Sequence, residues 1–277
     1  MADRIAFQGE LGAYSHQACR EVYPEMEVLP CDTFDDAVAA VKAGEASLAM
    51  LPVDNSTYGR VTDIHRLLPQ TGLYIIAEHF VPVRISLLGV EGATLDQVES
   101  AQSHTVLLGQ CRTFLQEHGI RPVVGADTAG SANQIAQAGE KSRAALASSL
   151  AGEIYGLTPL AENIQDHDHN TTRFLVMSPR RIEADPNGAN TITSFVFQVR
   201  NVPAALYKAM GGFATNSVNM VKLESYMTDG AFTATQFYAE IEGHPEHRNV
   251  QFAMEELGFF TSYLKVLGAY PRSEFRD

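Results

Sequence analysis

Hydrophobic and polar positions follow two different periods along the chain. Short apolar runs of about four to eight residues between polar turns are typical of buried strands, whereas amphipathic stretches that open on Ser, Thr or Asp are typical of helices. Up to about Pro179 the two patterns follow one another as strand, helix, strand and helix. This rhythm predicts α/β layers with a largely parallel sheet.

The pattern gives the expected bounds of each segment. Strands are expected at 4–8, 47–53, 74–77, 83–88, 99–102, 122–125, 143–147 and 172–177. Helices are expected from about Ser15, at 33–43, around Ile64, Leu67 and Leu68, and at 94–98, 104–118, 128–138 and 149–155. The strands at 74–77 and 83–88 have no helix between them, which indicates a crossover into a second lobe, and the last strand could return to the first lobe.

Two polar segments predict how particular helices begin. Thr33 with Asp36 three residues later resembles a capping box, and Gly44 is placed to end that helix. The segment 54–57, Asp-Asn-Ser-Thr, offers four side chains that could cap the helix around Ile64.

The segment 178–190 has the composition of a linker, with two prolines, a glycine and few apolar residues. We therefore expect a domain boundary near residue 185. Beyond it the pattern predicts a strand at 192–199, a helix at 203–214, strands at 217–225 and 231–241, a helix at 246–257 and a strand at 261–270. This βαββαβ order is that of a ferredoxin-like module.

The charge and the cysteine content exclude some classes of binding partner and indicate the cellular compartment. The 20 Lys and Arg against 33 Asp and Glu give a net charge of −13, which argues against nucleic acid or an anionic membrane as a partner. An anionic ligand would need local donors such as helix N-termini or placed arginines. Three cysteines without C-x-x-C spacing suggest neither a disulfide framework nor a zinc site, and neither a signal peptide nor a membrane span is expected. We expect a cytosolic protein.

Three polar segments follow predicted strands, where open α/β sheets bind ligands. The first, Gly9 to Ser15, could hold an anion on backbone N–H groups, although a structural turn capped by Ser explains it about as well. The second is Asp54 to Thr57, which has more donors and acceptors than a cap needs. The third is Ser103-His104 with Gln110; His104 could be a general base or a metal ligand, but a single His at a helix start is more often a cap.

Two histidine-containing segments suggest a metal by composition alone. Asp166-His167-Asp168-His169 has no third partner at suitable spacing, so we interpret it as a solvated loop, and His244 with His247 in the same way. We expect no metal and no cofactor. Arg173 could pair with a carboxylate and Thr172 could offer a hydroxyl to a reacting oxygen, although a strand start with a surface ion pair would explain them too.

Taken together, these segments resemble the prephenate dehydratase family over nearly the whole chain. The motifs that carry the resemblance are Phe7-Gln8-Gly9 to Tyr14-Ser15, Leu51 to Ser56 with Gly59, Ser103-His104 with Gly109-Gln110-Cys111, Ala147-Ser148 to Leu157, and Ile164-x-Asp166 with Asn170-x-Thr172-Arg173-Phe174. The resemblance implies a two-lobed catalytic region, like a periplasmic binding protein, with its site in the cleft. It would span 1–180, with lobe one at about 1–76 and 165–180 and lobe two at about 77–164.

The resemblance also implies the reaction and the roles of the site residues. Prephenate would lose carbon dioxide and its ring hydroxyl to give phenylpyruvate, in phenylalanine biosynthesis. Thr172 is implied as the hydrogen-bond donor to the leaving oxygen, with Asn55, Ser103 and Gln110 as the other catalytic residues. The residues implied to bind and orient the substrate are Ser15, Asp54, Ser56, His104, Arg173 and Phe174.

The C-terminal module, at 190–272, resembles the ACT domain that binds phenylalanine in this family. The effector-binding residues implied are Ala205, Leu206, Asn219, Glu224 and Ser225. Three positions depart from the family pattern: Ala204 replaces a glycine, Tyr226-Met227 replace Arg-Pro, and Asp54 replaces Glu. The first two put the strength and identity of the effector in question.

Two other functions fit the same sequence. Arogenate dehydratase would act on the amino analogue of prephenate, and a non-catalytic amino-acid sensor would use the lobes only to bind. Retention of Thr172-Arg173-Phe174 favours the enzyme. Because a ferredoxin-like sheet leaves edges uncovered, we expect a homodimer or a homotetramer.

Overall fold

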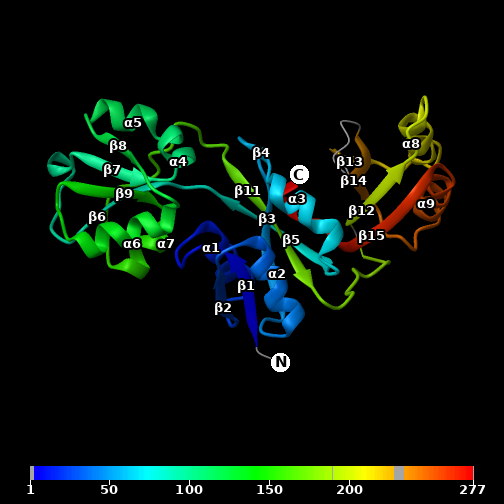
Figure 1. The fold of residues 1–277 in the computed structure, drawn as a ribbon, viewed down its shortest axis with the longest axis horizontal. Coiled ribbons are helices and arrows are strands. Elements are labelled where there is room, and N and C mark those ends of the chain that lie inside the picture. Colours follow the sequence, from blue (N-terminus) through cyan, green and yellow to red (C-terminus); the bar gives the residue numbers. More distant parts are fainter. Residues whose placement is uncertain (1–2, 189, 228–233, 277) are drawn as a thin grey trace. The chain divides into compact units, whose positions relative to one another are not determined.

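Three sheets organise the part of the chain that the structure, a computed structural model, describes: residues 3–188, 190–227 and 234–276 (Figure 1). The first sheet has the strand order β2-β1-β3-β11-β5, with β4 paired to β3. Its strands are β1 (Arg4–Gln8), β2 (Glu27–Cys31), β3 (Leu48–Asn55), β4 (Gly59–Arg60), β5 (Tyr74–Pro82) and β11 (Thr171–Ser178). Strand β1 is parallel to both β2 and β3, as the alternating pattern predicts.

The second sheet is mixed, with the order β10-β6-β9-β7-β8. Its strands are β6 (Ser86–Gly89), β7 (Ser100–Ser103), β8 (Arg121–Val124), β9 (Arg143–Ala147) and β10 (Thr158–Ala161). Strand β9 is parallel to β7 but antiparallel to β6. Helices α4 (Thr105–Gln110) and α5 (Arg112–Glu117) pack on one face, and α6 (Thr128–Ala138) and α7 (Ser149–Tyr155) pack on the other (Figure 1).

Most of the predicted helix bounds are confirmed. They can be predicted because residues next to each helix end cap or stop the helix. At α2 (Phe34–Ala43), Thr33 Oγ1 accepts a hydrogen bond from the Asp36 N–H at 3.1 Å, and Gly44 ends the helix with a left-handed φ of 77°. Ser148 caps α7 in the same way by accepting from the Ala151 N–H. The short 3₁₀ helix η2 (Leu95–Gln97) also lies where the pattern predicts a helix.

Three local predictions are wrong. Residues 54–57 cap no helix, because β3 continues through Asn55 and turns into β4, so that α3 (Thr62–Leu67) begins after Val61. Ser15 does not cap α1 (Tyr14–Val22), whose N-cap is Ala13. The single helix expected at 104–118 is two helices, because the chain leaves helical geometry at Cys111.

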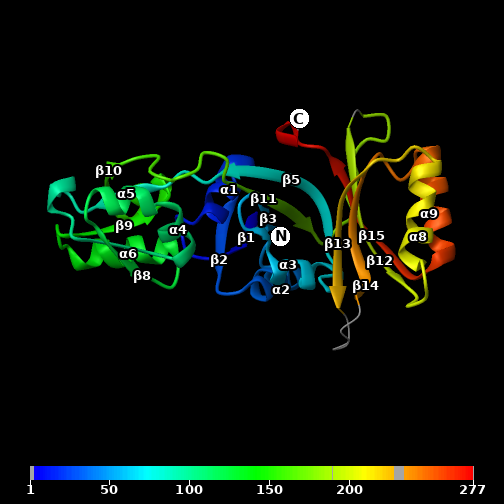
Figure 2. The same cartoon turned by 90° about the horizontal axis from the view of Figure 1, so that it is seen from above.

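The C-terminal segment forms the predicted ferredoxin-like module. Its described elements follow the order β12 (Thr191–Val199), α8 (Ala205–Thr215), β13 (Met220–Met227), β14 (Ala234–Glu242), α9 (Arg248–Phe260) and β15 (Thr261–Pro271). The antiparallel sheet has the order β13-β14-β12-β15, and α8 and α9 cover one of its faces (Figure 2). The first three residues of the predicted strand 231–241 lie outside the described residues.

Contacts divide the chain into two compact units. One comprises 1–60 and 80–174, and the other comprises 61–79 and 175–277, so that α3, the 3₁₀ helix η1 (Leu68–Gln70) and most of β5 belong with the ferredoxin-like module. The lobe and domain borders predicted from the sequence stay predictions.

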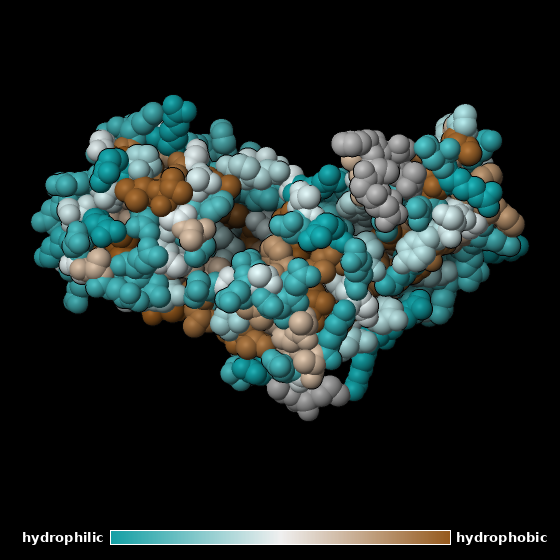
Figure 3. All heavy atoms as spheres, in the orientation of Figure 1, coloured by the Kyte–Doolittle hydropathy of each residue, from teal (hydrophilic) through white to brown (hydrophobic). Residues whose placement is uncertain are grey.

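The structure also shows how apolar residues are distributed over the helices and the surface. No helix among the described residues has both the length and the apolar character needed to cross a membrane. On the face shown in Figure 3, hydrophilic residues cover most of the surface and hydrophobic residues gather in separate patches, one of them over the second sheet.

Candidate active site

The residues that carry the family resemblance meet where β3 ends and β11 begins. The side-chain amide of Asn55 donates from Nδ2 to Asn170 Oδ1 at 2.7 Å and to Thr172 Oγ1 at 3.1 Å. The Asn55 Oδ1 atom accepts from the backbone N–H groups of Thr57 and Tyr58, at 3.0 and 2.9 Å. Since these two donors fix the orientation of the amide, Nδ2 must face Thr172.

Asn170 extends the network to the second lobe. It is 3% exposed, and its Nδ2 donates to Gln110 Oε1 at 2.8 Å, which leaves the Gln110 Nε2 group as a donor. Gln110, Asn170, Asn55 and Thr172 thus form one chain of hydrogen bonds, whose bonded pairs lie 60, 115 and 117 positions apart in sequence. The sequence analysis did not select Asn170 as a site residue, although it stands in the quoted Asn170-x-Thr172-Arg173 motif.

An ion pair lies beside this chain of hydrogen bonds. Arg173 Nη1 is 3.3 Å from Asp54 Oδ2, and the two side chains are 7% and 20% exposed. Phe174, the next residue on β11, is buried in the core. Because successive strand residues point to opposite faces, Thr172 and Phe174 share one face and Arg173 lies on the other.

Ser56 connects the turn after β3 to the segment before β11. Its Oγ donates to the His169 carbonyl at 2.6 Å and accepts from the Thr171 N–H at 2.9 Å, and its own N–H donates to the Thr171 carbonyl. These bonds hold the Asn55 turn against Thr172, so Ser56 supports the site geometry.

Ser103 and His104 make their contacts elsewhere. Ser103 is fully buried, and its hydroxyl donates to the Leu146 carbonyl on β9 at 2.7 Å. His104 caps α4, because its Nδ1 accepts from the Val106 N–H. Neither side chain joins the hydrogen bonds around Thr172 in this structure.

The turn Gly9 to Ser15 joins the two lobes. Ser148 Oγ donates to the Gly12 carbonyl at 2.6 Å, Tyr155 Oη donates to the Leu11 carbonyl, and Ser15 is buried in the first turn of α1. Gly12 has a φ of +91°, and a Cβ there would lie 2.7 Å from Ala151 Cα. The close approach of the lobes therefore requires glycine at this position.

Gly12→Ala should destabilise the protein by more than the cost of placing an alanine in the left-handed backbone conformation. Gly44 is the matched control, since it has a φ of +77° and a Cβ added there would meet nothing within 4 Å. We expect Gly44→Ala to cost about 1–2 kcal/mol and Gly12→Ala to cost roughly 1–3 kcal/mol more through overpacking. Denaturant unfolding of both variants measures the difference, and equal losses would contradict the close contact.

His16 forms part of the same turn and titrates abnormally. Its Nδ1 accepts from the Gly12 N–H at 3.0 Å, and its ring stacks on Phe7. Burial, with a smaller effect of Arg20, lowers the pKa of His16 below its usual value. The neutral ring is the form that can accept this hydrogen bond.

We expect the His16 interaction to stabilise the fold at high pH and to be lost on acidification. Because the folded pKa is lowered, the unfolded chain binds the proton more tightly, so this stability is present above about pH 6.5 and falls as the pH drops toward the lowered value. Unfolding measured between about pH 8 and 5 should show a weaker pH dependence in His16→Gln than in the unaltered protein. Identical slopes would contradict the assignment.

The acidic and histidine segment before β11 is tied to neighbouring elements. The Asp166 carboxylate accepts from the Thr113 N–H, and Asp168 Oδ1 lies 3.1 Å from Arg84 Nη1. Within the described ranges, no group of three or more His, Cys, Asp or Glu side chains is arranged to hold a metal ion.

The cysteines are poor nucleophiles. Burial raises the pKa of Cys19 and of Cys111 to about 12, with Asp166 adding to the effect at Cys111. Burial also raises the pKa of Cys31, and nearby carboxylates add to it. None of the three would be a thiolate at neutral pH.

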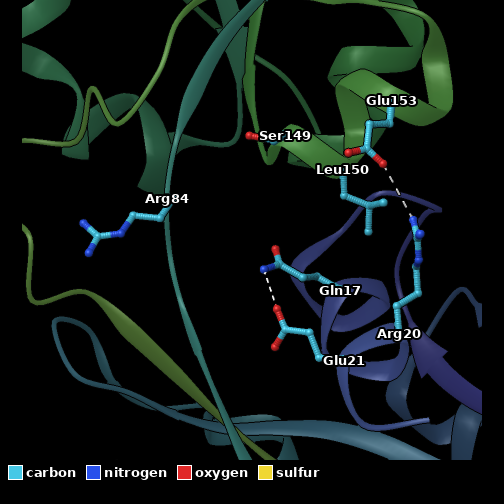
Figure 4. Close-up of a pocket in the computed structure, with 7 residues that line it drawn as sticks. All are labelled: Gln17, Arg20, Glu21, Arg84, Ser149, Leu150 and Glu153. Carbon is cyan, nitrogen blue, oxygen red and sulfur yellow. Dashed lines mark hydrogen bonds and ion pairs between the residues drawn. The ribbon is translucent and has the colours of Figure 1, made fainter. Parts of the chain in front are cut away.

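A cavity of about 410 Å³ lies between α1 and α7 (Figure 4), and Gln110, Asn170, Asn55 and Thr172 are not among its lining residues. Its lining residues are Gln17, Arg20, Glu21, Arg84, Ser149, Leu150 and Glu153. Arg20 and Glu153 face each other across it at 3.8 Å, and Gln17 bonds to Glu21 along α1. The candidate substrate site is therefore assigned from the converging polar residues and not from cavity volume.

The implied effector residues lie on two elements of the ferredoxin-like module. Ala205 and Leu206 begin α8, after Ala204, which adopts a left-handed φ of 60° where the family has glycine. Asn219 Nδ2 donates to Glu242 at 2.9 Å, Glu224 lies 3.5 Å from Lys222, and Ser225 is the next residue on β13. Glu224 thus already has a cation beside it.

A family model and two curated proteins match most of this chain. The prephenate dehydratase family model matches residues 5–182. A Komagataeibacter europaeus protein named bifunctional N-acyl-homoserine lactone acylase/prephenate dehydratase is 49% identical over 272 residues, 98% of this chain and 97% of that protein. Arogenate dehydratase/prephenate dehydratase 1 of Arabidopsis thaliana is 35% identical over 282 residues, 97% of this chain and 72% of that protein.

Two solved structures resemble the whole chain. One, described as a novel type of quorum-quenching acylase, has a TM-score of 0.93 and 48% identity and covers 99% of this chain and 100% of its own. The other is prephenate dehydratase of Arthrobacter aurescens in complex with L-Phe, with a TM-score of 0.88, 29% identity, and coverage of 97% and 90%.

Proposed function

The chain belongs to the prephenate dehydratase family, and we propose that it converts prephenate to phenylpyruvate, carbon dioxide and water. The observation that carries this proposal is the hydrogen-bonded chain Gln110, Asn170, Asn55 and Thr172, which joins the family motifs in space. No metal or cofactor is part of the proposal, because loss of carbon dioxide and of the ring hydroxyl makes the ring aromatic and so supplies its own driving force.

Thr172 is the donor to the leaving oxygen. The bond from the ring to its carboxylate breaks, and its electron pair enters the ring as carbon dioxide is released. The ring carbon–oxygen bond then breaks, and the leaving hydroxide takes a proton from solvent to become water. Because Thr172 Oγ1 already accepts from Asn55 Nδ2, its own O–H is directed toward another acceptor. A hydroxyl placed in this way can stabilise the leaving oxygen by a hydrogen bond.

The remaining site residues bind the substrate or hold the site together. The free amide donor of Gln110 is placed to bind a substrate carboxylate. Arg173 lies on the strand face opposite Thr172 and is paired with Asp54, so its role is to hold β3 and β11 together at the site. Ser56 holds the turn that carries Asn55, and we extend the assignment to Asn170, which positions both Gln110 and Asn55. The roles implied for Ser15, Ser103, His104 and Phe174 stay predictions.

The substrate is tested by offering prephenate and arogenate to the purified protein side by side at neutral pH. Phenylpyruvate from prephenate and phenylalanine from arogenate are measured without acid, because acid aromatises prephenate spontaneously. Faster turnover of prephenate supports the proposal. Turnover of arogenate alone would favour arogenate dehydratase, and binding without turnover of either would favour a sensor.

We further propose that the module at 190–272 is an ACT domain that binds phenylalanine and inhibits the enzyme. A related enzyme has been solved with L-Phe bound. The resemblance to the family assigns the pocket in this chain to Ala205, Leu206, Asn219, Glu224 and Ser225. Because Ala204 replaces a glycine, and Lys222 already pairs with Glu224, we expect weaker inhibition than the family pattern implies. Calorimetry with phenylalanine tests this, and no binding at millimolar concentration would contradict it.

The edge of the same sheet suggests how two copies of the chain could associate. Strand β13 lies at the edge of the four strands, and its Val221 and Leu223 side chains are 38% and 40% exposed. An exposed apolar edge strand is usually covered by a partner, and a second copy of this module is the simplest one. We therefore propose a homodimer or homotetramer, to be measured by sedimentation equilibrium. The cytosolic location stays a prediction from cysteine content.

A second activity is favoured by one relative. The Komagataeibacter protein, 49% identical, is named as an N-acyl-homoserine lactone acylase as well as a prephenate dehydratase. In this chain an apolar cavity of about 370 Å³ between α4, α5 and β8 could hold an acyl chain, since Leu108, Leu115, Ile120 and Val124 line it. Release of fatty acid from N-acyl-homoserine lactones, reduced by Leu108→Arg but not by Thr172→Ala, would support this second candidate.

A further inference from the structure

A polar cavity is lined by residues of α3, η1 and the third sheet. Helix α3 lies on the side of this sheet opposite α8 and α9 (Figure 2). All of the residues that line the cavity belong to one compact unit, residues 61–79 and 175–277. Its volume is about 440 Å³, and its lining residues are His65, Arg66, Pro69, Gln70, Gln198, Tyr226, Met227 and Gln236. This size is in the range of small-molecule sites.

The lining contains donors but no carboxylate, in a chain whose net charge is −13. Arg66 brings a guanidinium, and Gln70, Gln198 and Gln236 bring amides. Within the described ranges none of these four side chains has a hydrogen-bond or ion-pair partner of its own. Groups of this kind bind carboxylates well, because a guanidinium can donate two parallel hydrogen bonds to the two oxygens.

The nearby acidic side chains are already compensated. Glu240 shares Arg276 with Glu78, at 2.8 Å to each carboxylate, and Glu224 lies 3.5 Å from Lys222. An anion in the cavity would therefore face Arg66 with no carboxylate among the lining residues; Asp63, three residues before Arg66 on α3, is exposed and does not line the cavity.

The cavity also has an aromatic wall that is held in place. Tyr226 Oη lies 2.7 Å from Nδ1 of His65, which is 1% exposed and packs its ring edge-on against Tyr238. Met227 and Pro69 add apolar surface next to this tyrosine. Tyr226 and Met227 are the two residues that depart from the Arg-Pro pair of the family pattern.

We propose that this cavity binds an aromatic 2-oxo acid, with its carboxylate on Arg66, its oxo group on the glutamine amides and its ring against Tyr226 and Met227. The assignment of phenylpyruvate as the natural member of this class rests on the proposed function. An aromatic amino acid fits less well, because its ammonium group would find amide oxygens but no carboxylate among the lining residues.

Equilibrium dialysis of the full-length protein with labelled phenylpyruvate tests the proposal. We expect two sites per chain, one at the candidate active site and one in the cavity. Arg66→Met and Gln236→Leu should each weaken the cavity site about tenfold or more, as expected when a charge-assisted hydrogen bond or an amide donor is lost. Arg180→Met, which removes an exposed arginine outside the cavity, should change neither site.

The outcomes separate this proposal from the proposed function. Binding that depends on Arg66, in a protein that does not turn over prephenate, would support the cavity and contradict the dehydratase assignment. Phenylpyruvate binding unchanged in both Arg66→Met and Gln236→Leu would overturn the cavity assignment. It would also be overturned if phenylalanine displaced the ligand from the Arg66-dependent site as effectively as unlabelled phenylpyruvate.

Discussion

Thr172→Ala should lower the turnover of prephenate by about 10²- to 10⁴-fold, the range expected when a group positioned at the reacting oxygen is removed. Substrate binding should change little, since the Gln110 amide donor remains. The hydrogen bond from Asn55 Nδ2 to Thr172 Oγ1, at 3.1 Å, is the reason to expect so large an effect, because it directs the hydroxyl proton away from Asn55. Steady-state kinetics that separate kcat from KM give the result.

Thr171→Ala is the matched control. Thr171 is the preceding residue of β11 and has the same side chain, but its contacts to Ser56 are made by backbone atoms. We expect its turnover to stay within a few fold of the unaltered protein. Equal losses in the two variants would show that the strand, and not the Thr172 hydroxyl, is what the reaction requires.

Arg276→Met should strongly destabilise the folded protein. Arg276 donates to both oxygens of Glu78 and to Glu240, each at 2.8 Å, and the two carboxylate side chains are fully buried. Removing the shared cation leaves two buried carboxylates near each other. Removing one partner of a buried ion pair costs about 3–5 kcal/mol of folding free energy. Thermal unfolding should show a midpoint lower by roughly 10 °C.

Two further variants check that charge, and not the shape of the side chain, is responsible. Arg180→Met removes an exposed arginine and should leave the midpoint nearly unchanged. Adding Glu240→Gln to Arg276→Met should recover part of the loss, because it removes one of the two buried negative charges. No recovery in the double variant would contradict the electrostatic explanation.

The sequence predicted elements well where their ends depend on nearby residues. The bounds of α6, α7 and β9 were predicted to the residue, since Asp127 and Ser148 cap the two helices and Gly139 and Gly156 end them. Strands β2 and β10 were missed. Each lies at the edge of its sheet and contains a proline, so neither shows the apolar pattern of a buried strand.

Tertiary contacts explain what the local pattern could not predict. The helix expected at 104–118 breaks at Cys111, next to the Gln110 carbonyl, which accepts from the Asp166 N–H. This interaction joins residues far apart in the chain, so periodicity alone does not reveal it.

The contacts of the candidate site residues could not be predicted from the sequence either. The motifs selected Asn55, Gln110, Thr172 and Arg173, and the structure brings the first three together around Asn170. Ser103 stood in a matching motif, but its hydroxyl is bonded to the Leu146 carbonyl. A motif identifies which residue types are present, whereas the partner of each hydroxyl or amide depends on strands paired across the fold.

Single-turnover conversion of prephenate at neutral pH tests the central claim most directly. Excess protein is mixed with prephenate, and carbon dioxide and phenylpyruvate are followed without acid, with Thr172→Ala and Thr171→Ala in parallel. We expect both products in equal amounts, formed far faster than in the spontaneous reaction by the unaltered protein and by Thr171→Ala, and much more slowly by Thr172→Ala. Conversion at the spontaneous rate by the unaltered protein, or equal acceleration by Thr172→Ala, would contradict it.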